Sequence, residues 1–149
     1  MNDSVIYLDI EQALELHSWL LEKTKSSNRL KNSEYSNRKN LSNILKQIKN
    51  NEVYPEFKHK LTQLVFTIND SSKTIKDSKR LSIILGCYFL ELNGYDYVVP
   101  YFVEEMENIV VWLEQGRINR DLLSEIIESL IYEDYLSEEI KLKLAIAIS

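Results

Sequence analysis

Residues 77–95 have the sequence DSKRLSIILGCYFLELNGY, and this stretch decides the expected fold. It is apolar on nearly every side of a helical projection, which is typical of a helix surrounded by other helices. Asp77 or Ser78 can cap its start, and Gly94 stands where a left-handed residue closes a helix. The sequence therefore predicts a central helix over 77–93, the most buried element, with these core residues: Leu81, Ile84, Leu85, Tyr88 and Leu92.

Further helices are expected on both sides of the central one. Asp9 can begin a helix with Gln12 three residues later, which is the spacing of a capping box, and apolar residues at helical intervals continue it to about Lys25. Pro55 suits the first turn of another helix, where its missing amide proton costs nothing. The expected helices are 9–25, 41–48, 55–68, 102–115 closed by Gly116, 120–132 capped by Asn119, and 138 to the C-terminus capped by Ser137.

Three segments lack helical periodicity. Residues 5–8 are expected to form a short extended piece or strand. Residues 26–40 are rich in Ser, Asn, Lys and Arg, which predicts a loop or a short hairpin. Residues 69–76 carry many side chains that hydrogen-bond to nearby backbone, so they predict a turn before the central helix.

Length and composition favour one all-α domain over residues 1–149. The chain has 149 residues, of which 44% are hydrophobic and 28% charged, enough for a single core with an ordinary polar surface. It contains only 3 Gly and 2 Pro, so a sheet-rich fold with many tight turns is disfavoured. No linker or internal repeat interrupts the pattern.

The charge distribution disfavours a nucleic-acid partner. The formal net charge is −5, whereas broad phosphate-backbone binding needs clustered Lys and Arg. Lys and Arg are richer over 23–60 and acidic residues over the C-terminal third, but the signs interleave as on solvated helix faces. No apolar run has the length or flanks of a signal peptide or membrane span, so a cytoplasmic location without membrane binding is expected.

The reactive residue types are few. The single cysteine, Cys87, lies in an apolar run and is expected to be a small core residue, not a nucleophile. His17 lies on the apolar stripe of the first helix, which favours a structural role. His59 lies between two lysines on a predicted exposed face. Neither histidine has a nucleophile or a zinc-type ligand set beside it in the sequence.

Residues 72–80, with the sequence SKTIKDSKR, precede an apolar helix that ends in FLELNGY at 89–95. This arrangement resembles the Fic/death-on-curing (Doc) family, whose motif is His-x-Phe-x-Asp/Glu-Gly/Ala-Asn-Lys-Arg followed by a similar helix. The resemblance implies a Fic/Doc-like (Fido) helical bundle around a central apolar helix. Further similarities lie at Tyr54-Pro55, Ile6-Tyr7-Leu8, Glu15-Leu16-His17 and residues 114–118 (EQGRI).

The family's chemistry is carried by positions at which this chain differs. Ser72 stands at the place of the catalytic histidine, and a serine hydroxyl cannot replace a base that titrates near neutral pH. Lys76 stands at the place of the acidic magnesium ligand and would repel the cation. Thr74 replaces the buried phenylalanine. The degenerate positions are thus Ser72, Lys76, Asp77 and Ser78, with no catalytic residue and no metal site implied.

Two motif residues, Lys79 and Arg80, match the family. With Lys76 they are the phosphate-binding candidates, and with Lys73 they make a cationic group at the start of the central helix. Asp77 would compete with a phosphate there. The alternative to a phosphate-binding role is that these cations are solvated and partly paired with Asp70 and Asp77.

Three functions stay open at this point. The first is a catalytically degenerate binding or regulatory module without cofactors. The second is a divergent phosphoryl- or nucleotidyl-transferase that uses ATP and magnesium to modify a protein hydroxyl. The third, related to the first, is a pseudoenzyme that regulates an active family member or a toxin–antitoxin complex. Expected partners are an antitoxin, an active family member or a second copy of the chain.

Overall fold

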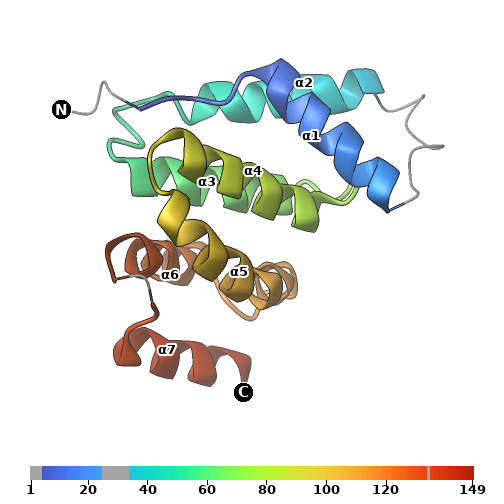
Figure 1. Ribbon diagram of the computed structural model, residues 1–149. Coiled ribbons are helices and arrows are strands. Elements are labelled where there is room, and N and C mark those ends of the chain that lie inside the picture. Colours follow the sequence, from blue (N-terminus) through green and yellow to red (C-terminus); the bar gives the residue numbers. More distant parts are fainter. Residues whose placement is uncertain (1–4, 25–33, 134) are drawn as a thin grey trace.

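The computed structural model describes residues 5–24, 34–133 and 135–149, and this part of the chain is all-helical, with no strand (Figure 1). The extended piece at 5–8 has no regular secondary structure. The elements are α1 (Ile10–Lys23), α2 (Glu34–Gln47), α3 (Phe57–Asn69), α4 (Ser78–Leu92), a 3-10 turn η2 (Asp96–Val98), α5 (Val99–Glu114), α6 (Arg120–Glu133) and α7 (Glu138–Ile148).

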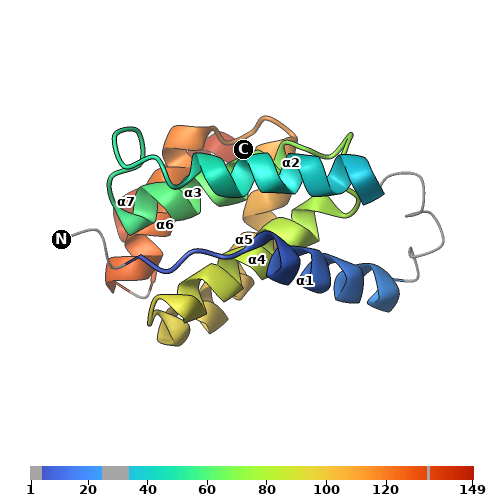
Figure 2. The same ribbon diagram turned by 90° about the horizontal axis from the view of Figure 1, so that it is seen from above.

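The helices form layers of two. Figure 1 shows α1 and α2 on one side of α3 and α4, with α5 and α6 on the other side and α7 beyond α6. Seen from above in Figure 2, α1 and α2 lie side by side. Within this stack α1 packs on α4, α2 on α3, α4 on α5 and α3 on α6. The middle layer is therefore covered from both sides.

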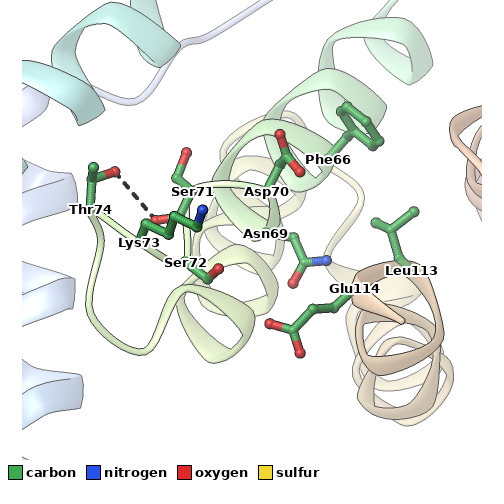
Figure 3. Close-up of a pocket in the computed structure, with 9 residues that line it drawn as sticks. All are labelled: Phe66, Asn69, Asp70, Ser71, Ser72, Lys73, Thr74, Leu113 and Glu114. Atoms are coloured by element: carbon green, nitrogen blue, oxygen red, sulfur yellow. Dashed lines mark hydrogen bonds between the residues drawn. The ribbon is translucent and has the colours of Figure 1, made fainter. Parts of the chain in front are cut away.

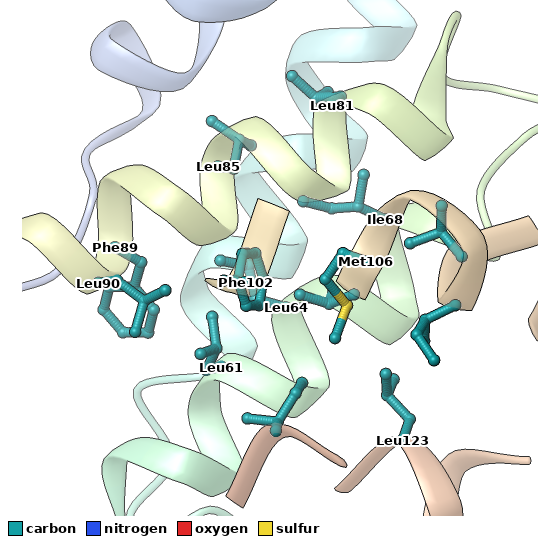
Figure 4. Close-up of a cluster of buried hydrophobic side chains, with 14 of the residues drawn as sticks. Leu61, Leu64, Ile68, Leu81, Leu85, Phe89, Leu90, Phe102, Met106 and Leu123 are labelled. Carbon is teal, nitrogen blue, oxygen red and sulfur yellow. The ribbon is translucent and has the colours of Figure 1, made fainter. Parts of the chain in front are cut away.

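The core lies around the middle layer (Figure 4) and receives side chains from every α-helix. The expectation that α4 is the most buried element is wrong, because α3 has the larger buried share, eight of its 13 residues against seven of 15 in α4. The reason is the position of α3, which α2, α4 and α6 cover on three sides. The α4 side chains that are buried are Ser78, Leu81, Ser82, Leu85, Phe89 and Leu90, and Gly86 is buried as well.

Three α4 residues predicted in the core are only half-buried: Ile84, Tyr88 and Leu92. Tyr88 lines an open groove of ≈ 430 Å³ between α1 and α4, together with Leu16 and Trp19 of α1. Helix α1 thus covers the outer face of α4 incompletely. A helix whose sequence is apolar on every side does not indicate which of its faces a neighbouring helix will leave partly uncovered.

The close packing of α4 on α5 depends on Gly86. A Cβ placed on Gly86 would lie 2.8 Å from Cζ of Phe102, and Phe102 is 1% exposed. The absence of a side chain therefore lets the ring of Phe102 lie against the α4 backbone. This contact fixes where the two helices meet.

Most helix ends follow their local sequence. Asp9 and Gln12 form the expected capping box, with Gln12 N donating to Asp9 Oδ1 at 2.8 Å. At the end of α4, Gly94 has φ 83° and Tyr95 N donates to the carbonyl of Leu90 at 2.9 Å. That bond belongs to a Schellman closure, in which glycine supplies the left-handed residue. The expected closure by Gly116 and the caps by Asn119 and Ser137 are also confirmed.

Three expected boundaries are corrected. Helix α2 begins at Glu34, inside the stretch predicted as a loop or hairpin, whereas residues 26–33 of that stretch lie outside the described part. Pro55 precedes α3 instead of opening it, because Glu56 is the N-cap. Helix α5 begins at Val99, with its proline in the first turn. In each case the sequence identified the helix and misplaced its start.

One buried cation links two elements. Lys60 of α3 is 0% exposed, and its Nζ donates to the carbonyl of Ile48 at 2.9 Å and to Oδ1 of Asn51 at 2.7 Å. The ring of Tyr7 lies beneath it, 5.5 Å from Nζ. Because Ile48 follows the last residue of α2, Lys60 places a positive charge at the C-terminal end of that helix, where it is stabilising.

Candidate binding site at the turn between α3 and α4

The turn that contains most of the stretch resembling the Fic/Doc motif connects the end of α3 to the start of α4. Ser71 Oγ donates to the carbonyl of Thr67 at 2.7 Å, and the carbonyl of Ser71 accepts from Ile75 N at 2.8 Å. The side chain of Ile75 is 1% exposed and anchors the turn in the core. Asp77 follows in the left-handed region with φ 58°. It occupies the predicted N-cap position, but its side chain caps no backbone amide.

His17 supports this turn from α1. Its Nε2 lies 2.7 Å from the carbonyl of Lys76 and its Nδ1 lies 2.8 Å from Nδ2 of Asn37. A carbonyl only accepts, so Nε2 carries the proton and Nδ1 accepts from Asn37. Burial lowers the pKa of His17, an effect that the bond to the Lys76 carbonyl and the charge of Asp77 oppose. The imidazole is 1% exposed and both nitrogens are occupied, as the structural interpretation predicts.

The predicted phosphate-binding residues have separate partners. Lys79 Nζ lies 2.9 Å from both carboxylate oxygens of Glu114 in α5. Arg80 extends to Asp77 at 3.5 Å, with 63% of its side chain exposed. Lys76 is half-buried, and its main chain accepts the His17 bond. These three positive charges lie near the start of α4. Lys79, however, is paired with the carboxylate of Glu114, a contact that the sequence did not predict.

The positions that the resemblance marks as substituted differ in accessibility. Ser72 and Thr74 are exposed on the turn, whereas Ser78 is 3% exposed in the first turn of α4. Thr74 Oγ1 donates to the nearby carbonyl of Ser71 at 3.3 Å. At the position where the resemblance implies a buried phenylalanine, the structure therefore places an exposed threonine.

A recess of ≈ 410 Å³ opens beside this turn (Figure 3). It lies where α3 and α5 end, and the turn forms its rim. Asn69, at the end of α3, is 3% exposed and donates from Nδ2 to the carbonyl of Val110 at 3.1 Å. Its Oδ1 is buried without a hydrogen-bond partner among the described residues. The recess is lined by Phe66, Asn69, Asp70, Ser71, Ser72, Lys73, Thr74, Leu113 and Glu114.

Sequence reasoning did not identify Asn69, Glu114 or Asn37 as site residues. Lys79 and Glu114 are 35 positions apart, and His17 and Asn37 are 20 apart. No local pattern relates residues at such separations. The polar residue Asn69 at the end of an apolar helical face was the one available signal.

The second histidine also has a structural contact. His59 is half-buried, not exposed as predicted, and its Nδ1 accepts a hydrogen bond from Glu56 N at 3.1 Å at the start of α3. It lines a smaller recess of ≈ 250 Å³ with Arg120, whose guanidinium donates to Oε1 of Gln63 at 2.7 and 3.2 Å. His59 therefore helps to begin a helix.

Cys87 is half-buried, and burial, aided by the nearby charge of Glu91, raises the pKa of its thiol to about 12. The thiol stays protonated at neutral pH, which disfavours a nucleophilic role. Within residues 5–24, 34–133 and 135–149, no group of three or more His, Cys, Asp or Glu side chains could hold a metal ion. Nor does any helix in that part have the length and apolar character to cross a membrane.

Comparisons with models of protein families, with curated proteins and with solved structures gave no match for this chain.

Proposed function

We propose that the chain is a Fic/Doc-like (Fido) protein whose active site is degenerate and which acts as a cytoplasmic binding or regulatory module. Its partner would be a protein: an antitoxin, an active family member or a second copy of the chain. The observation that carries this proposal is the state of His17. It is the histidine that contacts the motif turn, and both of its ring nitrogens are already bound.

A transferase would need a base and a cation at the same turn. General base catalysis requires a group that can take a proton within hydrogen-bond reach. The resemblance puts Ser72 at that place, and the lysine at position 76 would repel magnesium there. Lys79, which would hold a phosphate, is paired with Glu114. These features support binding over catalysis.

A weak anion site at the start of α4 would remain under this proposal. Arg80 is the more available cation, because its contact with Asp77 is long and most of its side chain is exposed. Backbone amides of the first helical turn add to its field. We expect Arg80→Ala to weaken phosphate or sulfate binding more than Lys79→Ala does, and we expect binding to fall as salt rises. Calorimetric titration of both variants with phosphate at two salt concentrations measures this.

The deciding test is titration of the purified chain with ATP, with and without magnesium. The proposal predicts no binding at millimolar nucleotide. Micromolar binding that requires magnesium would contradict it and would favour the transferase that modifies a protein hydroxyl.

A restoration experiment tests whether the frame of the motif is intact. The variant Ser72→His/Lys76→Asp/Ser78→Asn replaces three degenerate positions with the residues of the family motif. If the Fic/Doc-like frame is present, this variant should gain magnesium-dependent nucleotide binding. Because Ser78 is 3% exposed, the double variant without Ser78→Asn serves as a control for packing. Continued absence of binding in a folded triple variant would argue against the Fic/Doc-like assignment.

A further inference from the structure

The recess beside the turn between α3 and α4 contains a hydrogen-bond acceptor that lacks a donor among the described residues. Asn69 Oδ1 is buried and lacks a partner among the described residues. Because Nδ2 donates to the Val110 carbonyl, which can only accept, the amide orientation is fixed. Figure 3 shows the oxygen directed toward the space between Ser72 and Glu114. Buried polar atoms are nearly always hydrogen-bonded to protein, water or a ligand, so this oxygen calls for a donor, which a molecule held in the recess would supply.

The electrostatics of the recess favour a positive ligand. Helix α3 ends at Asn69 and α5 ends at Glu114, so two helix C-termini, each with partial negative charge, meet there. Asp70, the C-cap of α3, adds an exposed carboxylate that forms no ion pair or side-chain hydrogen bond within the described residues. Glu114 adds a second carboxylate.

Two lysines partly neutralise this negative charge. Lys79 occupies both oxygens of Glu114, and Lys73 lies on the rim of the recess. Neither lysine forms an ion pair with Asp70 or a hydrogen bond with Asn69 Oδ1 in the part of the chain that is described. The remaining acceptors are therefore an unpaired carboxylate and a buried amide oxygen.

The shape of the recess suits an organic cation. Its ≈ 410 Å³ is far more than one water molecule needs. Phe66 and Leu113 provide apolar wall on which an alkyl stem could pack while the charged head reaches Asn69 and Asp70. The described residues offer no group of three or more His, Cys, Asp or Glu side chains for a metal ion, whereas the amide oxygen of Asn69 and the carboxylate of Asp70 are acceptors for N–H donors.

We propose that this recess binds an alkylammonium or guanidinium group. The proposal rests on the proposed function, since it names the chemistry that a binding module would recognise beside the degenerate motif. The cation could be a lysine or arginine side chain of a protein partner or a free amine. Both sources present N–H donors on an aliphatic stem.

The test is titration of the ¹⁵N-labelled chain with agmatine and with N-acetyl-arginine amide, followed by NMR at the Asn69 side-chain amide. We expect a saturable shift of the Asn69 signals with both probes and none with N-acetyl-glutamine amide. Tighter binding of N-acetyl-arginine amide than of agmatine indicates a protein side chain as the source, and the reverse order indicates a free amine. No shift with either cation, or an equal shift with the neutral probe, would overturn the proposal.

Three variants sharpen the result. Asp70→Asn should weaken binding of both cations about two- to fivefold, as expected for loss of one partly exposed ion pair. Lys79→Met should tighten the binding of both cations because it frees the carboxylate of Glu114. The same lysine would instead assist an anion at the start of α4. Asp96→Asn is the matched control, since Asp96 is exposed at the far end of α4 and its loss changes the net charge equally. Equal effects of Asp70→Asn and Asp96→Asn would contradict a local site.

The two proposals fail in different ways. Magnesium-dependent nucleotide binding would contradict the binding-module function even if agmatine bound. Absence of cation binding, in a chain that also binds no nucleotide, would remove the recess proposal alone.

Discussion

His17 shows how a single buried residue makes folding sensitive to pH. Burial holds its folded-state pKa below the usual value of 6.5, so the unfolded chain takes up a proton more readily. The stabilisation is fully present above about pH 6.5 and is lost as pH falls toward the folded-state pKa. We expect the free energy of unfolding to decline over this range by about 1.4 kcal/mol for each unit by which the pKa is lowered. Urea unfolding between pH 7.5 and 5 measures it.

Two variants of His17 separate the effect of its titration from the effect of its hydrogen bond to the Lys76 carbonyl. His17→Gln retains an N–H donor for the Lys76 carbonyl but does not titrate, so its stability should decline less between pH 6.5 and 5 than that of the wild type. His17→Leu removes the donor and leaves a buried carbonyl unpaired, which should cost about 1–3 kcal/mol at pH 7.5. Identical pH profiles for the wild type and His17→Gln would show that this imidazole does not control acid sensitivity.

Cys87 allows a second prediction at the residue scale. With a thiol pKa of about 12, the thiolate fraction at pH 8 is on the order of a thousandfold below that of an unperturbed thiol. Alkylation by iodoacetamide should therefore be slow in the folded protein and become fast in denaturant. Mass spectrometry of the time course gives both rates. Rapid modification of the folded chain would contradict the assigned thiol environment.

At the scale of the element, the crossing of α4 and α5 is set by Gly86. In an exposed helix interior, Gly→Ala stabilises by about 1 kcal/mol. Here the added methyl group would meet the ring of Phe102 at 2.8 Å, and that ring is buried. We expect Gly86→Ala to destabilise by about 1–3 kcal/mol through overpacking. Chemical denaturation gives the value.

A second-site change provides the control for this crossing. Gly86→Ala combined with Phe102→Leu should be less destabilised than the sum of the single variants, because the smaller side chain makes room for the methyl group. If Gly86→Ala proved stabilising, α4 and α5 would not approach each other at this residue.

At the scale of the whole molecule, the core is continuous from α1 to α7, which favours the single domain expected over residues 1–149. Leu85 is 0% exposed in the middle layer, so Leu85→Ala should lower the free energy of unfolding by about 2–5 kcal/mol. Ile84→Ala, at a half-buried neighbour, should cost less. Both variants should unfold in one transition by far-ultraviolet circular dichroism and tryptophan fluorescence. Two separated transitions would indicate two domains.

The sequence alone determined the helical class and most helix ends. Caps and closures such as Asp9 with Gln12, and Gly94 after α4, act within a few residues of the chain, so their pattern is visible in one dimension. The turn between α3 and α4 was predictable for the same reason, although its expected range of 69–76 included Asn69, which is the last residue of α3. The start of α2 was not, because its first turns contain Asn37, whose partner His17 lies on another helix.

Only the tertiary structure decided which surfaces of these helices became buried or formed a site. The open groove beside Tyr88, the pairing of Lys79 with Glu114 and the recess around Asn69 all depend on how layers meet. Apolar periodicity specifies that a face is covered but not by which neighbour or how completely. Residues 35 or more positions apart, such as Lys79 with Glu114 or His17 with the Lys76 carbonyl, come together only through that packing.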